Sequence, residues 1–333
     1  MTIDYQKVCD GLFQGLNPRK KKILERRFGL ATDGPLTLQA IGDEIGITRE
    51  RVRQIENDTF EWLRESQKAK LEKPFRYFLD YFEGQGGLKE ETRLLEDLGR
   101  DRFQGYVLLL LALGENFYKF KETDDFYSFW TVRPDYFQQA REVVDNIIQE
   151  FEKTKSPLEI KEIGNRITYN LSSPAVASYV EISKSVFQSP FGLYGLSEWP
   201  EVNPRGLKDK AYLVLKTKND PLHFTQIAEL IGKLPMVSKR VLPESVHNEL
   251  IRNNRFVLVG RGIYALTEWG YEPGTVKEII ANVLRKSKKS LSKKEIVKKV
   301  LEQRQVKENT ILLNLQDEKL FEKDEKAKYS LVN

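Results

Sequence analysis

The sequence predicts a mainly α protein built from several small domains in tandem, with short β-hairpins in the part that follows the first domain. Three observations lead to this prediction. An N-terminal segment contains two short amphipathic helix patterns joined by a glycine turn, and the rest of the chain repeats one order of elements. The 333 residues are also more than a single small helical domain usually holds.

The segment from Thr37 to Arg64 has the signals of two helices and a tight turn. Thr37 and Thr48 are suitable N-cap residues, because a hydroxyl can accept an unpaired backbone N–H of a first helical turn, and Gly46 permits the left-handed conformation in which helices often end. Residues at the spacing of one buried face follow in the second helix, namely Val52, Ile55 and Thr59. This pattern predicts a helix-turn-helix within a domain at 1–70, preceded by a lead-in helix at 1–15.

The opposite face of the second helix, which we place at 48–63, carries charged and amide side chains: Arg49, Glu50, Arg53 and Gln54. Arg can bond bidentately to guanine, Gln can do the same to adenine, and Glu can accept from cytosine, so these four are candidate base-reading residues. Three neighbours are candidate contacts to the DNA backbone: Thr37, Thr48 and Arg51. The alternative interpretation is a solvated charged face. We favour base reading because the caps, the turn and the apolar spacing agree with it.

These residues resemble region 4 of bacterial primary sigma factors, which reads the −35 promoter element. The resemblance begins with LNPRKKKILERRFGL (Leu16 to Leu30), continues through DGPLTL and ends with ITRERVRQIE. It implies promoter-like double-stranded DNA as the partner, and RNA polymerase core as a second partner, because this family docks on the polymerase flap. It implies base contacts by Arg49, Glu50 and Gln54, and backbone or supporting contacts by Thr37, Arg51 and Arg53.

The resemblance weakens after Glu56. Where the family usually continues with Lys and Arg, this chain has Asn57, Asp58 and Glu61, so attraction to phosphates behind the recognition helix is expected to be weaker. Only about 15 residues precede the match, which is far below the size of a further domain. We therefore expect that the chain is not a complete sigma factor and does not open a promoter alone.

Beyond residue 70 the chain repeats a motif. FGLYGLSEWP from Phe191 and RGIYALTEWG from Arg261 share the pattern G-x-Y-x-L-[ST]-E-W, and Trp199 and Trp269 lie 70 residues apart (269 − 199). Weaker versions, FYSFW and AKYSL, end at 130 and 331. This spacing is typical of tandem small domains. It predicts repeats at 71–134, 135–202, 203–272 and 273–333.

The repeat at 203–272 shows the order of elements most clearly. Helix patterns at 206–216, 225–231 and 243–252 precede two alternating strands around Gly260 and Gly262, which is a hairpin signal. Three helices followed by a hairpin are the winged-helix arrangement. The strings PLHFTQIAELI and SVHNELIRNNRFVLVGRGIYALTEWG resemble the HARE-type winged helix, a family that includes the amino-terminal domain of the RNA polymerase delta subunit. That resemblance implies a place in transcription, with either DNA or protein as the ligand.

Composition excludes several other functions. Cys9 is the single cysteine, and the two histidines are His223 and His247, too few for a disulfide framework or a Cys- or His-rich metal centre. We find no nucleotide-binding glycine loop and no nucleophile–base pair, so we expect neither an enzyme nor a cofactor. The longest apolar run, Tyr106 to Leu113, is too short to span a bilayer, and we expect a cytoplasmic, nucleoid-associated protein.

The net charge of +5 is unevenly spread. Residues 1–70 hold 13 basic and 11 acidic side chains, residues 71–273 hold 26 and 29, and residues 274–333 hold 15 and 9, which gives +2, −3 and +6. Basic ends suit contact with DNA. Further candidate backbone contacts are Arg261 at a predicted hairpin tip and, near a helix turn of the last repeat, Lys288, Lys289 and Lys293. The alternative for each is a solvated turn or face.

The sequence therefore predicts a sequence-specific DNA-binding regulator of bacterial transcription initiation. It would read a −35-like element with the helix at 48–63, and its winged helices would add backbone or protein contacts through tethering. Two alternatives remain open. One is an accessory protein that associates with RNA polymerase, and the other is a winged-helix protein–protein scaffold with little specific DNA readout.

Overall fold

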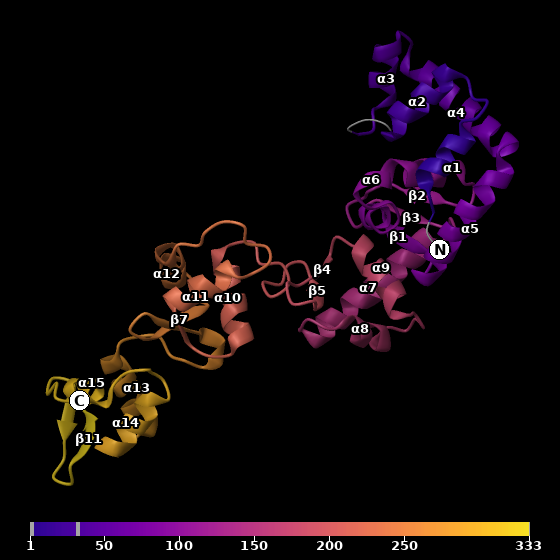
Figure 1. The fold of residues 1–333 in the computed structure, drawn as a ribbon. Coiled ribbons are helices and arrows are strands. Elements are labelled where there is room, and N and C mark those ends of the chain that lie inside the picture. The colour runs from indigo at the N-terminus through magenta and orange to yellow at the C-terminus, as the bar shows by residue number, and fades with distance from the viewer. Residues whose placement is uncertain (1–2, 31–33, 333) are drawn as a thin grey trace. The chain divides into compact units, whose positions relative to one another are not determined.

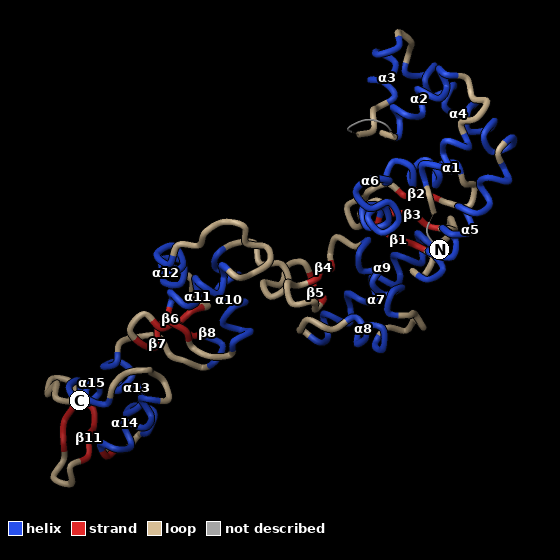
Figure 2. The backbone as a smooth tube through the Cα atoms, viewed as in Figure 1, coloured by secondary structure: helices blue, strands red, loops and turns tan. Residues whose placement is uncertain are grey.

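The computed structural model describes residues 3–30 and 34–332. The chain forms two compact units, Met1–Phe187 with Leu193–Ser197, and Gln188–Gly192 with Glu198–Asn333. Both are built mainly from helices, with short strands between them (Figures 1 and 2). Over the described ranges, no helix has the length and apolar character that a membrane span requires.

The first unit begins with four helices, α1 (Tyr5–Leu12), α2 (Pro18–Phe28), α3 (Leu38–Ile45) and α4 (Arg49–Ser66). α1 lies within the lead-in helix expected at 1–15; it starts at Asp4, whose carboxylate accepts from the Lys7 backbone N–H at 3.0 Å. The first two residues of that expected helix, and Asp33 of the DGPLTL string, lie outside the described residues.

After α4, one order of elements occurs four times, namely helix, helix, helix and hairpin, and we call each occurrence a module. A short strand precedes the second helix in the first, third and fourth modules, and an isolated bridge at Leu158 takes its place in the second. The first module contains α5 (Lys68–Gly84), β1 (Leu88–Glu90), α6 (Glu91–Leu113), β2 (Tyr118–Phe120) and β3 (Phe129–Thr131). Its α6 is two helices joined at Arg100, where φ is 47°. The second module contains α7 (Tyr136–Thr154), α8 (Ile160–Arg166), α9 (Ser173–Ile182), β4 (Val186–Gln188) and β5 (Tyr194–Leu196).

The second unit holds the other two modules. The third contains α10 (Leu207–Lys218), β6 (Leu222–His223), α11 (Phe224–Gly232), α12 (Pro243–Arg252), β7 (Phe256–Gly260) and β8 (Ile263–Leu266). The fourth contains α13 (Val276–Ser287), β9 (Leu291–Ser292), α14 (Lys293–Leu301), α15 (Glu308–Asn314), β10 (Phe321–Lys323) and β11 (Lys328–Leu331). The three helices of the third module lie within two residues of the predicted ranges at each end, and its hairpin lies around Gly260 and Gly262 as predicted.

The modules share one strand register. Leu158 lies opposite Tyr194 across an isolated bridge, and strand pairing places Leu222 opposite Tyr264 and Leu291 opposite Tyr329. The sheets of the first, third and fourth modules have the same strand order when each is read from the short strand: β1-β3-β2, β6-β8-β7 and β9-β11-β10. The tyrosine of the repeated motif therefore marks the same place in three modules. The strand before the second helix is absent from the sequence prediction, because two or three residues are too few to show alternation.

The link between α4 and the first module differs from the prediction. The polar stretch from Glu65 to Lys73 predicts a helical extension or linker that ends before Pro74, but α5 runs through Pro74 to Gly84. Proline removes one helical N–H, and the burial of its ring in this helix provides an apolar contact that offsets the loss. The predicted boundary between residues 70 and 71 also falls inside α5.

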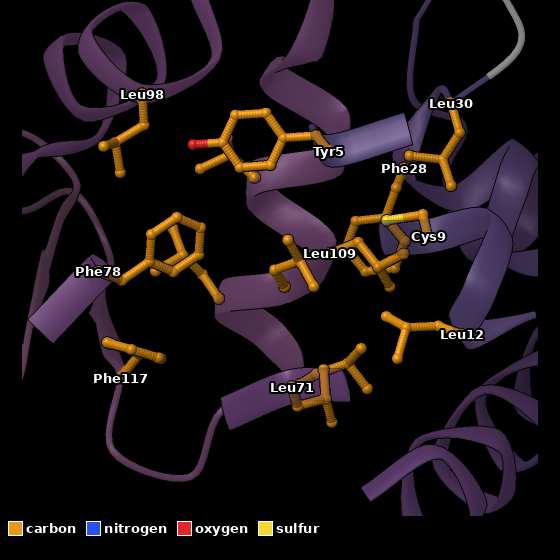
Figure 3. Close-up of a cluster of buried hydrophobic side chains, with 14 of the residues drawn as sticks. Tyr5, Cys9, Leu12, Phe28, Leu30, Leu71, Phe78, Leu98, Leu109 and Phe117 are labelled. Carbon is orange, nitrogen blue, oxygen red and sulfur yellow. The ribbon is translucent and has the colours of Figure 1, made fainter. Parts of the chain in front are cut away.

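One hydrophobic core joins the N-terminal helices to the first module. Figure 3 shows its side chains from α1, α2, α5 and α6, among them Tyr5, Cys9, Leu12, Phe28, Leu71, Phe78 and Leu109. Polar contacts hold α6 in place: the Tyr106 hydroxyl donates to the Leu30 carbonyl at 3.0 Å, and Arg64 Nε of α4 donates to the Leu113 carbonyl at 2.8 Å. The apolar run that ends at residue 113, which is the third helix of this module, is thus built into the core.

The third helix of the second module, α9, packs against the first module. A Cβ on Gly86 would lie 2.5 Å from the Cβ of Ala175 in α9, so the chain before β1 approaches α9 as closely as glycine allows. Lys89 of β1, only 6% exposed, reaches Glu181 of α9 with Nζ 2.7 Å from Oε2. In the first unit, therefore, neither third helix presents its face freely to a ligand.

The third and fourth modules each have their own core, and a backbone junction joins them. The Gln305 N–H donates to the Val259 carbonyl at 2.7 Å, next to a bridge between Gln305 and Gly260. Arg304, 3% exposed, donates to the carbonyls of Glu272 and Gly274 at 2.6 and 2.8 Å. The segment before α15 therefore lies along the edge of the hairpin of the third module.

Candidate nucleic-acid interface

The turn between α3 and α4 fixes the candidate reading helix. A Cβ on Gly42 would lie 2.5 Å from the Ile47 carbonyl oxygen, so the close approach at this turn requires glycine. Gly46, with φ of 71°, ends α3. The Thr37 and Thr48 hydroxyls each accept a backbone N–H at 3.2 Å, from Ala40 and Arg51, which confirms both predicted caps. Each hydroxyl keeps its own proton, which it can still donate to a phosphate.

A small core holds the two helices together. Ile41 of α3, and Val52 and Ile55 of α4, are buried with Ile23 of α2. Thr59 is also buried, and its hydroxyl donates to the Ile55 carbonyl at 2.5 Å, which satisfies a polar group that would otherwise be unpaired. The predicted buried face of α4 is therefore confirmed.

The opposite face of α4 is open to solvent over its first two turns, and it holds every predicted base-reading residue: Arg49, Glu50, Arg53 and Gln54. Arg53 Nη2 lies 2.6 Å from Glu50 Oε1, and Arg53 Nε lies 3.0 Å from Oε2. Arg51 Nη1 donates to Gln54 Oε1 at 3.1 Å. Three of the four candidate base-reading side chains are thus engaged along the helix, Glu50 with Arg53 and Gln54 with Arg51.

This pairing favours the ionised form of Glu50. The hydrogen bonds from Arg53 lower the pKa of the Glu50 carboxyl, with further lowering from the Arg53 and Arg49 charges. The ionised carboxylate acts only as a hydrogen-bond acceptor. An acceptor at this position suits the amino group of cytosine.

α2 contacts both α3 and α4 through ion pairs. Arg27 Nη1 donates to the Leu36 carbonyl at 3.2 Å, and Arg27 Nε lies 3.3 Å from Glu56 Oε1 of α4. Burial raises the pKa of Glu56, and the Arg27 charge opposes that rise. Arg26 reaches Glu44 of α3 at 3.2 Å. These contacts fix the angle at which α4 presents its exposed face.

The C-terminal half of α4 lacks a basic surface. Asn57, Asp58 and Glu61 are all exposed, so negative charge lies along the helix beyond the reading face. Exposed carboxylates repel phosphates. Any attraction to a DNA backbone must therefore come from other parts of the chain.

The remaining predicted DNA contacts lie in the second unit. Arg261 is exposed in the tip between β7 and β8 of the third module, and three lysines are exposed around β9 of the fourth module: Lys288, Lys289 and Lys293. Over the described ranges, none of these four side chains forms an ion pair. Lys294 follows Lys293 at the start of α14 and is also exposed. Lys326 and Lys328 could not be connected with these residues from the sequence, because only the pairing of β11 with β9 brings that hairpin alongside.

The two histidines form local packing and capping contacts. His223 Nδ1 accepts from the Thr225 backbone N–H at 3.4 Å and caps α11, and His247 stacks on Phe224 with ring centroids 4.4 Å apart. Within residues 3–30 and 34–332, no group of three or more His, Cys, Asp or Glu is placed to hold a metal ion.

Comparisons with known proteins match the N-terminal part of the chain. Residues 12–65 match the family model of sigma-70, region 4, which confirms that part of the resemblance. A segment is 39% identical over 72 residues to the RNA polymerase sigma factor RpoD of Helicobacter pylori strain 26695, covering 21% of this chain and 11% of that protein. Another alignment is 42% identical over 60 residues to the RNA polymerase sigma factor SigA of Clostridium acetobutylicum, covering 18% and 16%.

The chain therefore spans well under a fifth of the length of these curated relatives. The match to the family model covers α2, α3 and nearly all of α4. The resemblance of the third module to the HARE-type winged helix stays a prediction.

Proposed function

We propose that this protein is a sequence-specific DNA-binding regulator of bacterial transcription initiation, which reads a −35-like element with the first two turns of α4. The observation that carries the proposal is an exposed set of base-reading side chains within the sigma-70, region 4 match: Arg49, Glu50, Arg53 and Gln54. Guanidinium, carboxylate and amide groups together can distinguish guanine, cytosine and adenine in a major groove.

Binding requires an exchange of partners on this face. Arg53 must release Glu50, and Gln54 must release Arg51, before their polar atoms can bond bases. Exposed pairs of this kind are weak, whereas a bidentate base contact is worth about 1–3 kcal/mol of discrimination. The exchange therefore favours DNA when the bases match.

We further propose that the four modules are winged helices with two different roles. In the first unit they support α4: Arg64 of α4 bonds the end of α6, and both third helices are buried, which leaves α4 as the reader. A reader held on a rigid body loses little freedom on binding. The third and fourth modules supply additional contacts, and their covalent tether raises the effective concentration of each.

A second candidate function is that of an accessory protein associated with RNA polymerase, acting in the cytoplasm by binding and not by catalysis. The third helices of the second unit favour protein contact: α15 contains no Lys or Arg and exposes Leu313 at 66%, and α12 exposes Ile251 at 62%. Such faces suit a protein surface better than phosphates.

Selection of bound duplexes from a random DNA library tests the first proposal. The full chain should enrich one short −35-like element. The Arg49→Ala/Gln54→Ala variant, which keeps the caps and the buried face of α4, should enrich none. Equal recovery of unrelated sequences by the wild-type chain would overturn the proposal and favour the second candidate.

A further inference from the structure

The fourth module concentrates lysines along one side of its sheet. Lys288 and Lys289 precede β9, and Lys293 and Lys294 follow it at the start of α14. The pairing of β11 with β9 sets Lys328 opposite Ser292, and Lys326 lies two residues earlier in the same hairpin. We call these side chains the lysine edge: Lys288, Lys289, Lys293, Lys294, Lys326 and Lys328.

The lysine edge carries free positive charge. All six side chains are exposed, and over residues 3–30 and 34–332 none of them forms an ion pair. Two other lysines of the module do: Lys277 lies 2.5 Å from Asp317, and Lys286 is paired with Glu272. Over the same residues Lys299, Lys319 and Lys323 form no ion pair either, so the edge is distinguished by the clustering of its lysines.

The acidic groups beside this edge are partly engaged elsewhere. Glu295 accepts the Ser292 N–H at 2.8 Å and the Ser292 hydroxyl at 2.6 Å, so it caps α14. These bonds lower the pKa of Glu295, and the charges of Lys328 and Lys289 lower it further. Lys328 on β11 and Lys289 before β9 thus both act on one carboxylate. Asp324 accepts the Lys328 backbone N–H at 2.8 Å, and the turn also holds Glu325.

The repeated fold provides an internal comparison. The N-cap of the second helix is Ser292 in the fourth module, His223 in the third, Glu159 in the second and Glu90 in the first. We compare four positions in each module: the fourth and third residues before this cap, and the first and second residues after it. In the fourth module all four are lysines, namely Lys288, Lys289, Lys293 and Lys294. The third module has Asn219, Asp220, Phe224 and Thr225; the second has Lys155, Ser156, Ile160 and Lys161; the first has Gly86, Gly87, Glu91 and Thr92. The fold therefore does not require lysine at these positions.

Lys288 also ends a helix. Its φ of 52° is left-handed, as are those of Asn219 and Lys155 at the equivalent places of the third and second modules. Lysine therefore forms this helix end in two modules, and only in the fourth module is it accompanied by lysine at all three of the other compared positions.

The chemistry of the edge indicates a ligand with regularly spaced negative charge. Six flexible ammonium groups form point contacts and recognise phosphates without reading bases. The edge includes no exposed aromatic ring on which unstacked bases could lie, which favours a duplex over a single strand. α15 contains no Lys or Arg, so the positive side of this module is the edge and not its third helix.

We propose that the lysine edge binds the phosphate backbone of double-stranded DNA, without sequence preference, and anchors the chain near the element that α4 reads. This inference rests on the proposed function. It supplies the backbone attraction that α4 lacks beyond Glu56, where Asp58 and Glu61 are exposed. The reading helix gives specificity, and the lysine edge gives salt-dependent affinity.

The test measures binding of the full chain to a scrambled duplex, a −35-like duplex and a single strand at several salt concentrations. The edge variant is Lys289→Gln/Lys293→Gln/Lys328→Gln. Its matched control, Lys299→Gln/Lys319→Gln/Lys323→Gln, removes the same charge from exposed positions of the same module; Lys323 lies on β10, the opposite edge strand of the sheet. Thermal melting of both variants checks that they fold.

For the edge variant, the slope of log affinity against log salt should fall by roughly 0.9 per lost phosphate contact on both duplexes, with an unchanged preference between them. The control should retain most of the wild-type slope. An edge variant that binds like wild type, a control that loses as much, tighter binding to the single strand, or no duplex binding by the wild-type chain would each overturn the inference. Edge-dependent binding without any preference between duplexes would overturn the proposed function alone.

Discussion

Arg53 donates to both carboxylate oxygens of Glu50, with Nη2 2.6 Å from Oε1 and Nε 3.0 Å from Oε2. The two residues lie one turn apart on the exposed face of α4, and their side chains are 52% and 60% exposed. A base that accepts from Arg53 competes with Glu50 for the guanidinium. A base that donates to Glu50 competes with Arg53 for the carboxylate. The pair therefore links two adjacent readout positions.

Glu50→Gln should reduce sequence preference while strengthening binding to unrelated DNA. The substitution replaces the charged acceptor for cytosine with a weaker amide oxygen and adds an amino donor. It also removes a negative charge that would face the phosphates and weakens the hold on Arg53. We expect the preference for a −35-like duplex over a scrambled one to fall by about tenfold or more. Titration of both duplexes measures the ratio. Glu61→Gln, further along the same exposed helix, should strengthen binding to both duplexes without changing the ratio; an unchanged ratio in Glu50→Gln would contradict this account.

Gly86→Ala should separate the second module from the first. The new Cβ would meet Ala175 at 2.5 Å, and φ at this residue is +79°, so overpacking and backbone strain add. We expect a loss of about 2–4 kcal/mol in the free energy of unfolding. Urea denaturation measures it. Gly84→Ala, at the end of α5 where nothing lies within 4 Å, is the control and should be neutral or stabilising; equal losses in both would argue against the close contact.

Lys89→Met should destabilise the first unit more than the double substitution Lys89→Met/Glu181→Met. The single change leaves the Glu181 carboxylate without the ammonium that lies 2.7 Å away. Breaking a fully buried pair costs about 3–5 kcal/mol, and because the Glu181 side chain is 26% exposed we expect about 2–3 kcal/mol. Denaturation of the two variants compares them. A double variant that loses the sum of both single losses would show that the two residues do not interact.

The fourth module should lose stability in acid through its capping carboxylates. The Thr275 backbone N–H lowers the pKa of Glu278, and the Ser292 hydroxyl lowers that of Glu295. A lowered folded-state pKa means that the unfolded chain binds more protons, so the contribution is complete above the unfolded value of about 4.3 and is lost as the pH falls below it.

Glu278→Gln/Glu295→Gln tests this dependence. The variant should melt at a lower temperature than wild type at neutral pH, and the difference should shrink as the pH falls towards and below about 4.3. Circular-dichroism melts across this range measure the difference. Glu318→Gln, an exposed residue of the same module that lies outside its helices and strands, should show no such trend. A difference independent of pH would mean that the carboxylate charge does not stabilise these helix ends.

The sequence predicted the local features of the site because those features depend on near neighbours. Thr37, Gly46 and Thr48 mark helix ends through bonds within three or four residues, and Val52, Ile55 and Thr59 follow the helical period of one buried face. The exposure of the opposite face follows from the same period. The pairing of Arg53 with Glu50 could also be expected from their spacing.

Features that depend on distant contacts could not be predicted. The apolar run at 106–113 indicated a buried helix but not the elements that it packs against. Pro74 suggested a helix end because proline lacks an N–H, and the burial that keeps it inside α5 depends on distant contacts. Lys328 joins the lysine edge only through strand pairing with Ser292, 36 positions earlier in the numbering (328 − 292). Burial of α9 likewise depends on Gly86 and Lys89 of another module.

The central claim is that α4 reads a specific DNA sequence, and fluorescence anisotropy tests it most directly. The full chain, its Arg49→Ala/Gln54→Ala variant and a Lys68→Ala control would be titrated against a −35-like duplex and a scrambled duplex at several salt concentrations. The account predicts that wild type and control prefer the −35-like duplex, and that the double variant loses about 1–3 kcal/mol of this preference per lost bidentate contact. Equal binding of both duplexes by the wild-type chain, with a steep salt slope, would contradict it and leave only backbone attraction.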